Sequence, residues 1–349
     1  MNGAGARVAV VLFNLGGPDD QDSVRPFLEN LFSDPAIITL PWLLRRPLAA
    51  AIARLRTRWA KSNYALMGGG SPLLPQTLAQ RQALETALSI RMPGQEVRAF
   101  TAMRYWRPTT GQAAEAVRSF APDEIVLLPL YPQFSTTTTA SSLKAWRAVY
   151  AGPGRSRAVC CWYDDEALAR AHADSIQSIW ELAGKPAVRL LFSAHGLPRS
   201  VASSGDPYQW QVEATCAKVA ALLPGDWDWR VCYQSRVGPM RWIGPSTPEA
   251  IGQAAADGVG VLIDPIAFVS EHIETLVELD RDYRRLAEAA GVPTYLRAPT
   301  LRTAPIFIEG LADLVVSALE RSGDQPGARG CPGSLTRCGR RPGRVDHAV

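Results

Sequence analysis

The sequence predicts an α/β fold of the doubly wound kind, in which helices cover both faces of parallel sheets. Three observations favour it. Short β-branched runs alternate with segments of helical periodicity along the whole chain. These runs are almost continuously apolar, as strands are when both of their faces are buried. The chain has 349 residues, of which 47% are apolar, so it can bury enough core for two domains.

The expected strands are short apolar runs, and each is followed by a segment with helical periodicity. They lie at residues 8–13, 97–103, 125–130, 158–163, 188–192, 230–233 and 259–263. A last helix is expected over residues 307–320, where leucine and valine recur on one face, and that face should be docked onto the rest of the protein.

The chain is expected to form two similar halves. The boundary is placed in a polar stretch, which gives an N-terminal domain over residues 1–165 and a C-terminal domain over 166–320. Two pairs of fragments look alike and hint at duplication: VVLFNLGGP at 10–18 with LLFSAHGLP at 190–198, and 127–134 with 262–268. The remaining tail, 321–349, is rich in Gly, Pro and Arg, and we expect it to be mobile unless something ties it down.

The distribution of charge argues against a nucleic-acid partner. The net charge is +4, and the tail alone, with six Arg and two Asp, accounts for it. A nucleic-acid-binding domain needs a basic stripe that the balanced body of the chain lacks. Six cysteines are too sparse for a disulfide framework, and the first residues show no signal-peptide pattern, so we expect a cytoplasmic protein. No run reaches the ~20 apolar residues of a membrane span, so any membrane contact would be peripheral.

A nucleotide cofactor is disfavoured by the glycine pattern. Gly16 and Gly17 follow a strand where a dinucleotide fingerprint would begin. The third glycine of that fingerprint is absent, and Pro18 blocks the start of a phosphate-binding helix. The glycine run at 68–70 lacks the lysine of a P-loop.

Polar residues at the carboxyl ends of the strands are the first candidates for chemistry, because ligands of open α/β sheets bind there. Such residues occur at 14–18, 131–139, 193–196 and 270–274. His195 follows an apolar strand directly, and Gly196 leaves room for a ligand to approach its ring. His195 fits a ligand or a proton-transfer group, and it equally fits a neutral histidine bonded to backbone in a turn.

An acidic row is the second candidate. On a helix, Glu271, Glu274 and Glu278 fall at i, i+3 and i+7, on one face. A solvated acidic face would explain the row without any chemistry. Alternatively, one carboxylate facing a buried imidazole across a cleft would make a divalent-metal site with open positions, and the stacked row behind it could pass protons.

A basic and apolar lip is expected over residues 35–62. From Pro35 to Leu84 the chain has no Asp or Glu, and Trp42, Leu43 and Leu48 interleave with arginines. Such a segment suits a membrane surface, or the rim of a pocket for a flat apolar ligand with acidic side arms. An ordinary Arg-rich surface helix accounts for it equally well.

In several long blocks the sequence resembles the ferrochelatase family over about residues 7–320. The blocks occur in the order that the family has. They are LFNLGGPD at 12–19, GGGSPL at 68–73, LPLYPQFSTTTTASS at 128–142, SAHGLP at 193–198, YQSRVGPMRWIGP at 233–245 and PIAFVSEHIETLVELD at 265–280.

The resemblance implies two Rossmann-like domains with a porphyrin cleft between them, as in chelatases. It implies a lyase that inserts Fe²⁺ into protoporphyrin IX without ATP, in the last step of haem synthesis, with the porphyrin and ferrous iron as its partners. The catalytic and iron-binding pair falls on His195 and Glu274, and we assign Glu271 and Glu278 to a proton relay. The porphyrin contacts of the family fall on Leu15, Arg104, Tyr105, Tyr131, Ser135 and Trp242.

Alternatives remain within this resemblance. Relatives that act on coproporphyrin III tend to carry Tyr where this chain has Leu15, and an apolar side chain there suits the vinyl groups of protoporphyrin IX. A chelatase for coproporphyrin III, another tetrapyrrole or another metal is the second reading, and a non-catalytic porphyrin or haem carrier is the third. A carrier has no use for the acidic row. The family includes dimers, so the chain is expected to be a monomer or a homodimer.

The cysteines raise the question of a cofactor. Some relatives bind a [2Fe–2S] cluster through one internal cysteine and three in a C-terminal tail. Cys331 and Cys338 resemble the first two of that tail set, but Arg340 stands where the third is expected. With Cys161 or its neighbour Cys160 as the internal ligand, three thiolates are one short of the usual four. The other cysteines, Cys216 and Cys232, are expected to be small buried hydrophobes.

Overall fold

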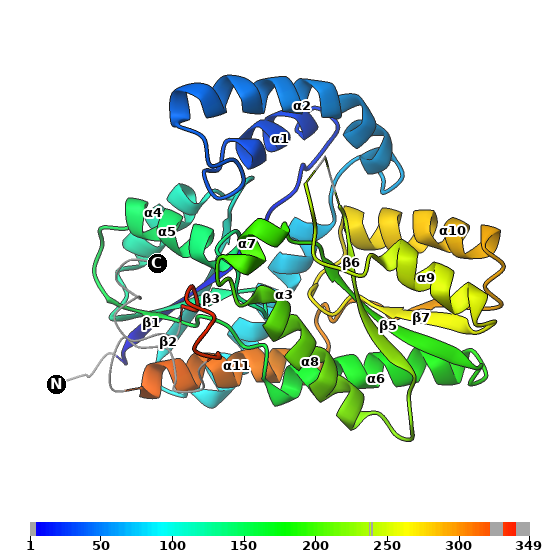
Figure 1. Cartoon of the computed structure of the whole chain (residues 1–349). Helices are drawn as coiled ribbons and strands as arrows, with labels where there is room; N and C mark the ends of the chain where they lie inside the picture. Colours follow the sequence, from blue (N-terminus) through cyan, green and yellow to red (C-terminus); the bar gives the residue numbers. More distant parts are fainter. Residues whose placement is uncertain (1–4, 237, 239, 322–330, 340–349) are drawn as a thin grey trace.

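The computed structural model describes residues 5–236, 238, 240–321 and 331–339. It contains two four-stranded parallel sheets, of order β2-β1-β3-β4 and β6-β5-β7-β8, with helices on both faces of each (Figure 1). The first sheet is made of β1 (Arg7–Asn14), β2 (Glu96–Met103), β3 (Glu124–Pro129) and β4 (Arg155–Ala158). The second is made of β5 (Val188–His195), β6 (Trp229–Gln234), β7 (Gly260–Asp264) and β8 (Tyr295–Arg297). The predicted doubly wound α/β class is confirmed.

Alternate residues of the central strands supply two cores, one on each face. In β1, Val10 and Leu12 pack with α3 (Leu73–Arg91) and α11 (Pro305–Glu320), whereas Val11 and Phe13 pack with α4 (Thr110–Phe120) and α5 (Thr139–Val149). This is the period of two that a strand imposes. In the second sheet, β5 divides its residues between α6 (Glu166–Leu182) with α8 (Tyr208–Leu222) on one face and α9 (Thr247–Ala256) with α10 (Arg284–Ala289) on the other.

The two sheets have the same topology, since the first strand of each half is central and the second and third strands flank it. The two pairs of similar fragments fall on equivalent strands. Fragments 10–18 and 190–198 run out of β1 and β5, and fragments 127–134 and 262–268 run out of β3 and β7. The structure therefore supports the hint of duplication.

Two strand expectations need correction. A strand was expected over residues 158–163, but the observed strand, β4, lies earlier, at Arg155–Ala158. The apolar run that follows is a buried loop, in which Trp162 donates from its backbone N to Pro132 O and from its indole to Pro129 O. The short edge strand β8 was not expected at all, since three residues carry too little periodicity to detect.

The last helix crosses the expected domain boundary. The strands do divide near residue 165. The helix α11 was assigned to the C-terminal half, and it packs against α6 of that half but also against α3 and β3 of the N-terminal half. Leu311 and Val315 of α11 share a core with Val10 of β1 and Leu84 of α3. The apolar face that predicted docking thus joins the two halves.

Part of the tail is tied to the body. Over residues 331–339 it lies beside α8, where Arg337 N donates to Gly205 O at 3.0 Å and Cys338 is fully buried (Figure 1). Gly339 packs so closely on Cys160 and Phe134 that a Cβ there would lie 2.7 Å from the Cys160 sulfur. The expectation of a mobile tail is wrong for this stretch. Its other parts, 322–330 and 340–349, and with them Arg340, lie outside the described residues.

Two helices form a separate layer over the carboxyl ends of the strands. These are α1 (Val24–Phe32) and the longer α2 (Trp42–Ala65), which lie together at the top of Figure 1. Phe27 and Leu28 of α1 pack against Ala53 and Ala60 of α2. None of the described helices is both long enough and apolar enough to cross a lipid bilayer.

Candidate active site

A cavity of about 860 Å³ lies between the carboxyl ends of the two sheets, under α1 and α2. Its lining comes from both halves of the chain. Leu15 follows β1, Tyr105 follows β2 and Tyr131 follows β3, whereas His195 ends β5 and Ser235 follows β6. The strand ends that were expected to hold the site therefore converge on one space, of the size that small-molecule ligands occupy.

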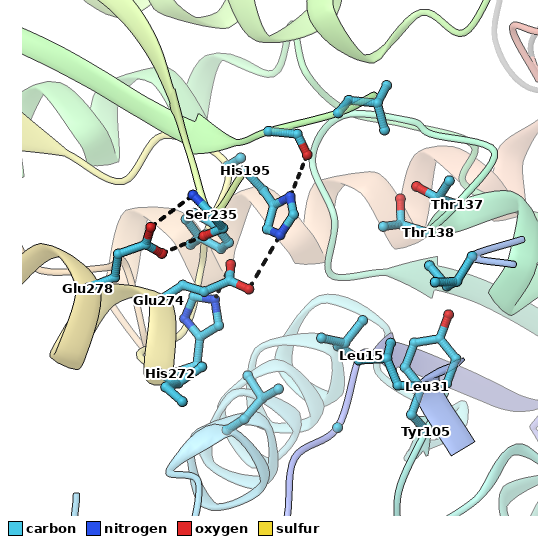
Figure 2. Close-up of a pocket in the computed structure, with 18 of the residues that line it drawn as sticks. Leu15, Leu31, Tyr105, Thr137, Thr138, His195, Ser235, His272, Glu274 and Glu278 are labelled. Carbon is cyan, nitrogen blue, oxygen red and sulfur yellow. Dashed lines mark hydrogen bonds and ion pairs between the residues drawn. The ribbon is translucent and has the colours of Figure 1, made fainter. Parts of the chain in front are cut away.

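His195 and Glu274 are in direct contact on one wall of this cavity (Figure 2). His195 Nε2 lies 3.5 Å from Glu274 Oε1, and His195 Nδ1 lies 2.6 Å from the carbonyl oxygen of Gly196. Both residues were expected in the C-terminal half, but on opposite sides of a cleft. The structure places them side by side on one wall of the cavity. A Cβ at Gly196 would lie 2.8 Å from Gln234 O, so only glycine fits beside this histidine.

The two groups form an ion pair at neutral pH. Burial opposes the protonated imidazole, but the Glu274 carboxylate and the Gly196 carbonyl outweigh it and raise the pKa of His195 to about 9. Burial also opposes the charge of Glu274, yet His195 and His272 hold the pKa of that carboxyl well below its usual range. The side chain of His195 is 42% exposed and that of Glu274 is 22% exposed, so water in the cavity screens part of this attraction.

His272 was missed by the sequence analysis. Its Nε2 lies 3.3 Å from Glu274 Oε2, so the carboxylate has a histidine on each oxygen. The ring packs on Phe268, with 4.5 Å between the ring centroids. The signal for it was its position two residues before Glu274, in a segment that follows a buried strand.

The segment that carries Glu274 is a π-helix, Glu274–Tyr283. Side chains of the neighbouring strands bond its backbone carbonyls. Gln234 Nε2 donates to Glu274 O at 2.8 Å, and Tyr295 Oη donates to Leu279 O at 2.5 Å. π-helices are rare, most are single turns, and they are frequent at functional sites. Both Glu274 and Glu278 line the cavity.

Glu278 is held by several hydrogen-bond donors. Its Oε1 accepts from Ser235 N at 2.9 Å and from Tyr283 Oη at 2.5 Å, and its Oε2 accepts from Ser235 Oγ and from Gln234 Nε2. Ser235 has a φ of +62°, a left-handed backbone that is costly for a residue other than glycine. The Glu278 carboxylate, which accepts from both the backbone and the hydroxyl of Ser235, offsets that cost.

Glu271 does not belong to the same row. Its carboxylate is fully buried, accepts from Arg297 Nη1 at 2.9 and 3.2 Å and from Thr300 N at 3.1 Å, and does not line the cavity. The expectation of three carboxylates on one helical face is therefore corrected. The α-helical spacing was applied to a residue that precedes the helix, and the helix itself is π.

The expected porphyrin contacts divide into two groups. Leu15, Tyr105, Tyr131 and Trp242 line the cavity, and Figure 2 shows Leu15 and Tyr105 on the side away from Glu274. Two others lie behind the wall. Arg104 Nη2 is 2.7 Å from the buried carboxylate of Asp34, and Ser135 Oγ donates to Asp206 Oδ2 at 3.1 Å.

The lip forms the roof of the cavity. Arg56 and Trp59 of α2 line it, and the Arg56 guanidinium lies 5.6 Å from the Trp59 ring centroid. The rim of a pocket was one of the expectations for this segment, although Trp59 was not singled out. Trp42, Leu43 and Leu44, at the start of the same helix, are exposed.

The glycines after β1 serve packing. A Cβ at Gly17 would lie 2.6 Å from the side chain of Ser71, and one at Gly70 would lie 2.1 Å from Asp19 O. The glycine pattern is thus explained by two chain segments that touch, with no phosphate needed.

The three cysteines that were expected at a cluster lie close together, and two of them contact the side chain of Gln211. Gln211 Nε2 lies 3.5 Å from the Cys161 sulfur and 3.1 Å from the Cys331 sulfur, and Cys338 is hydrogen-bonded to Cys331. Among the described residues, no group of three or more His, Cys, Asp or Glu side chains is arranged to hold a metal ion. Cys216 and Cys232 are fully buried, as expected.

Comparisons of the sequence with known proteins agree on one family. The sequence profile described as Ferrochelatase matches residues 7–319. The chain is similar to the ferrochelatase of Phenylobacterium zucineum, with 58% identity over 97% of this chain and 99% of the relative. It is also similar to the ferrochelatase of Caulobacter vibrioides, with 61% identity over 88% of this chain and 89% of the relative.

Solved structures share the fold. One is CbiX, described as the terminal enzyme for biosynthesis of siroheme in denitrifying bacteria, with a TM-score of 0.50 and 18% identity over 90% of this chain and all of CbiX. Another is SirB from Bacillus subtilis with Fe³⁺, with a TM-score of 0.52 and 13% identity over 91% of this chain and 97% of SirB. At these identities the likeness is one of fold alone.

Proposed function

The chain belongs to the ferrochelatase family, the lyases that insert iron into a porphyrin, and from this premise we propose that its substrates are Fe²⁺ and protoporphyrin IX and that it needs no nucleotide. The observation that carries this proposal is the ion pair of His195 with Glu274 on one wall of a cavity whose opposite wall is apolar.

The reaction exchanges one Fe²⁺ for two pyrrole protons, so the site must attract a dication and then remove protons. At rest His195 is protonated and cannot accept another proton. Fe²⁺ that approaches the Glu274 carboxylate competes with the imidazolium for it, so the pKa of His195 falls and its proton is released to water in the cavity. The neutral Nε2 that results can accept a pyrrole proton or bind the metal. With two side-chain ligands, the metal keeps open positions for the porphyrin nitrogens.

Glu278 is the proposed next group for protons. It lines the cavity one turn after Glu274, and it accepts hydrogen bonds from the hydroxyls of Ser235 and Tyr283, which can pass a proton on. Glu271, assigned to the relay from the sequence, is left out of this path because its carboxylate is completely buried, is paired with Arg297 and does not line the cavity.

Protoporphyrin IX suits the walls. Leu15, Leu28 and Leu31 line the cavity on the side of the N-terminal half, where vinyl and methyl groups can pack. Arg56 and Arg236 also line it and can pair with the two propionates.

Anaerobic incubation with Fe²⁺ and either protoporphyrin IX or coproporphyrin III, without nucleotide, tests the proposal. Faster metallation of protoporphyrin IX, followed by absorbance, supports it. Preference for coproporphyrin III would contradict the substrate, a need for ATP would contradict the mechanism, and porphyrin binding without metallation would favour a carrier.

We further propose that the start of α2 rests on an anionic membrane surface, on the cytoplasmic side. Trp42, Leu43 and Leu44 are 60 to 67% exposed at this end of the helix, and Arg46 lies beside them without an acidic residue nearby in the sequence. An apolar edge with basic neighbours is the pattern of an interfacial helix. Protoporphyrin is itself poorly soluble in water, so a membrane contact beside the roof would serve its delivery.

A [2Fe–2S] cluster at the cysteines remains to be tested. Cys161, Cys331 and Cys338 lie together, but they are one thiolate short of four, so no step of the reaction is derived through a cluster. Visible absorbance of anaerobically purified protein that disappears in Cys331→Ser would assign a cluster to these thiols. A colourless wild type would show that they only fasten the tail to α8.

A further inference from the structure

One arginine is bonded to both sides of the segment that carries Glu274. Arg297, the last residue of β8, donates from Nη1 to the carboxylate of Glu271 at 2.9 and 3.2 Å. From Nε and Nη2 it donates to the two carboxylate oxygens of Asp280, each at 2.6 Å. Glu271 precedes Glu274 by three residues and Asp280 follows it by six. A single guanidinium therefore brackets the proposed catalytic carboxylate.

These contacts are strong ones. The side chain of Arg297 is 9% exposed, and that of Glu271 is completely buried. The contact with Asp280 is a bidentate fork, which fixes direction as well as distance. Without Arg297, the buried Glu271 carboxylate keeps only Arg302, at 3.4 Å and half-exposed, as a charged partner, so the loss costs more than that of a surface pair.

The π-helix needs external support of this kind. Its wider turn with i→i+5 hydrogen bonds is rarely sustained beyond one turn, yet this one extends over ten residues. The strand β8 supports the π-helix through hydrogen bonds. Tyr295 Oη donates to Leu279 O at 2.5 Å, and Arg284 Nη1, just after the π-helix, donates to Tyr295 O at 3.1 Å. Arg297 adds the only side chain of β8 that reaches both ends of the Glu271 to Asp280 stretch among the described contacts.

We propose that Arg297 is a positioning residue for metal insertion. By fixing Glu271 and Asp280 to β8, it holds the π-helix in the place where the Glu274 carboxylate meets His195 Nε2. Arg297 does not line the cavity, so it acts through the helix rather than on the porphyrin. This inference rests on the proposed function.

The expected signature is a loss of rate without a loss of porphyrin binding. A displacement of a catalytic group by about 1 Å can lower a rate about 100-fold, whereas the apolar walls that bind the macrocycle do not depend on Arg297. In Arg297→Gln we expect kcat to fall by about tenfold or more. KM for the porphyrin, and its Kd from fluorescence titration, should stay within about twofold. Arg297→Lys keeps the charge but cannot form both forks, so its kcat should be intermediate.

Arg189 provides a matched control. Its side chain is also 9% exposed, and it also joins two carboxylates, those of Asp228 at 2.7 Å and Asp257 at 2.9 Å. It lies near the start of β5, six residues and therefore about 20 Å along the strand from His195. Arg189→Gln should lower Tm and leave kcat unchanged.

A normal kcat in folded Arg297→Gln, or an equal loss of kcat in Arg189→Gln, would overturn the positioning role. If Arg297→Gln does not fold, Asp280→Asn replaces it, because this change weakens only the fork on the π-helix; a reduced kcat with unchanged porphyrin Kd supports the role, and an unchanged kcat rejects it. A wild type that metallates no porphyrin would instead overturn the proposed function.

Discussion

At the scale of single residues, the contact between His195 and Glu274 sets the protonation state of the site. Glu274 raises the pKa of His195 to about 9, and Glu278 adds a smaller effect of the same sign. Because this pKa is above the ordinary value of ~6.5, the ion pair stabilises the fold fully below about pH 6.5. The contribution is lost as the pH rises through about 9.

This predicts the titration of His195 in substitution variants. In an NMR titration, Glu274→Gln should lower the pKa of His195 to its ordinary value or below, because burial is then less opposed. Glu278→Gln should lower it by less. The stability difference between wild type and Glu274→Gln, from denaturant unfolding, should shrink between about pH 6 and 10. A pKa of His195 that is unchanged in Glu274→Gln would show that the pair is not coupled.

Leu15 predicts substrate preference. It lines the cavity where an apolar substituent of the porphyrin can pack, and a tyrosine there would bring a hydroxyl into that wall. Leu15→Tyr should lower kcat/KM for protoporphyrin IX by about tenfold and leave that for coproporphyrin III less affected. The control is Leu31→Met, which keeps a similar side-chain volume on the same side of the cavity. It should change kcat/KM for each of the two porphyrins by no more than about twofold. An equal loss for both porphyrins in Leu15→Tyr would separate this residue from specificity.

At the scale of elements, α2 has two tasks on different parts of its length. Arg56 and Trp59 face the cavity, whereas Trp42 and Leu43 are exposed at its start. We expect the double change Trp42→Ser and Leu43→Ser to reduce cosedimentation with anionic vesicles several-fold and to leave metallation in detergent unchanged. The loss of two apolar side chains from a lipid surface accounts for that effect.

A control lies on the same helix. Leu55 is 82% exposed, and it is 13 residues after Trp42, about 0.6 of a turn around the helix axis. Leu55→Ser should leave vesicle binding unchanged. If it weakens binding as much as the double change, the contact is non-specific and the proposed orientation of α2 is wrong.

Buried parallel strands such as β1 and β5 can be predicted from the sequence, because their apolar runs are unbroken. Ligands of such sheets bind near the carboxyl ends of the strands, and this led to His195 and Glu274. The π-helix could not be foreseen, because its carbonyls are held by Gln234 and Tyr295 from other strands. The position of Glu271 was misjudged because this residue precedes the helix, whose start at Glu274 the sequence does not mark. The contact of Arg104 with the buried Asp34 carboxylate could not be predicted, because the spacing of residues along the chain does not say which side chains pair in the folded protein.

At the scale of the whole molecule, the site exists only because two similar halves are held at a fixed separation. One residue that links the halves by hydrogen bonds is Gln80 of α3, which is completely buried. Its Nε2 donates to Val269 O at 2.9 Å and to Arg302 O at 3.0 Å, and its Oε1 accepts from Ser270 Oγ at 3.2 Å. These partners belong to the loop after β7 and to the segment before α11. The amide thus ties the N-terminal sheet to the chain that leads into Glu274.

The substitution Gln80→Leu tests the contribution of these hydrogen bonds to stability. Leucine fills much of the same volume but leaves Arg302 O without the amide donor and the buried Ser270 hydroxyl without its acceptor, whereas Val269 O keeps the hydrogen bond from Arg302 N. The loss of this buried polar contact costs about 1–3 kcal/mol. Denaturant unfolding should show a loss of stability in that range, and metallation should slow because the loop that leads into the π-helix is less restrained. Gln82→Leu, on the exposed side of the same helix, should change stability by no more than about 0.5 kcal/mol. Equal stability of the two variants would mean that the halves are held together elsewhere, with the core shared by α11 and α3 as the next contact to examine.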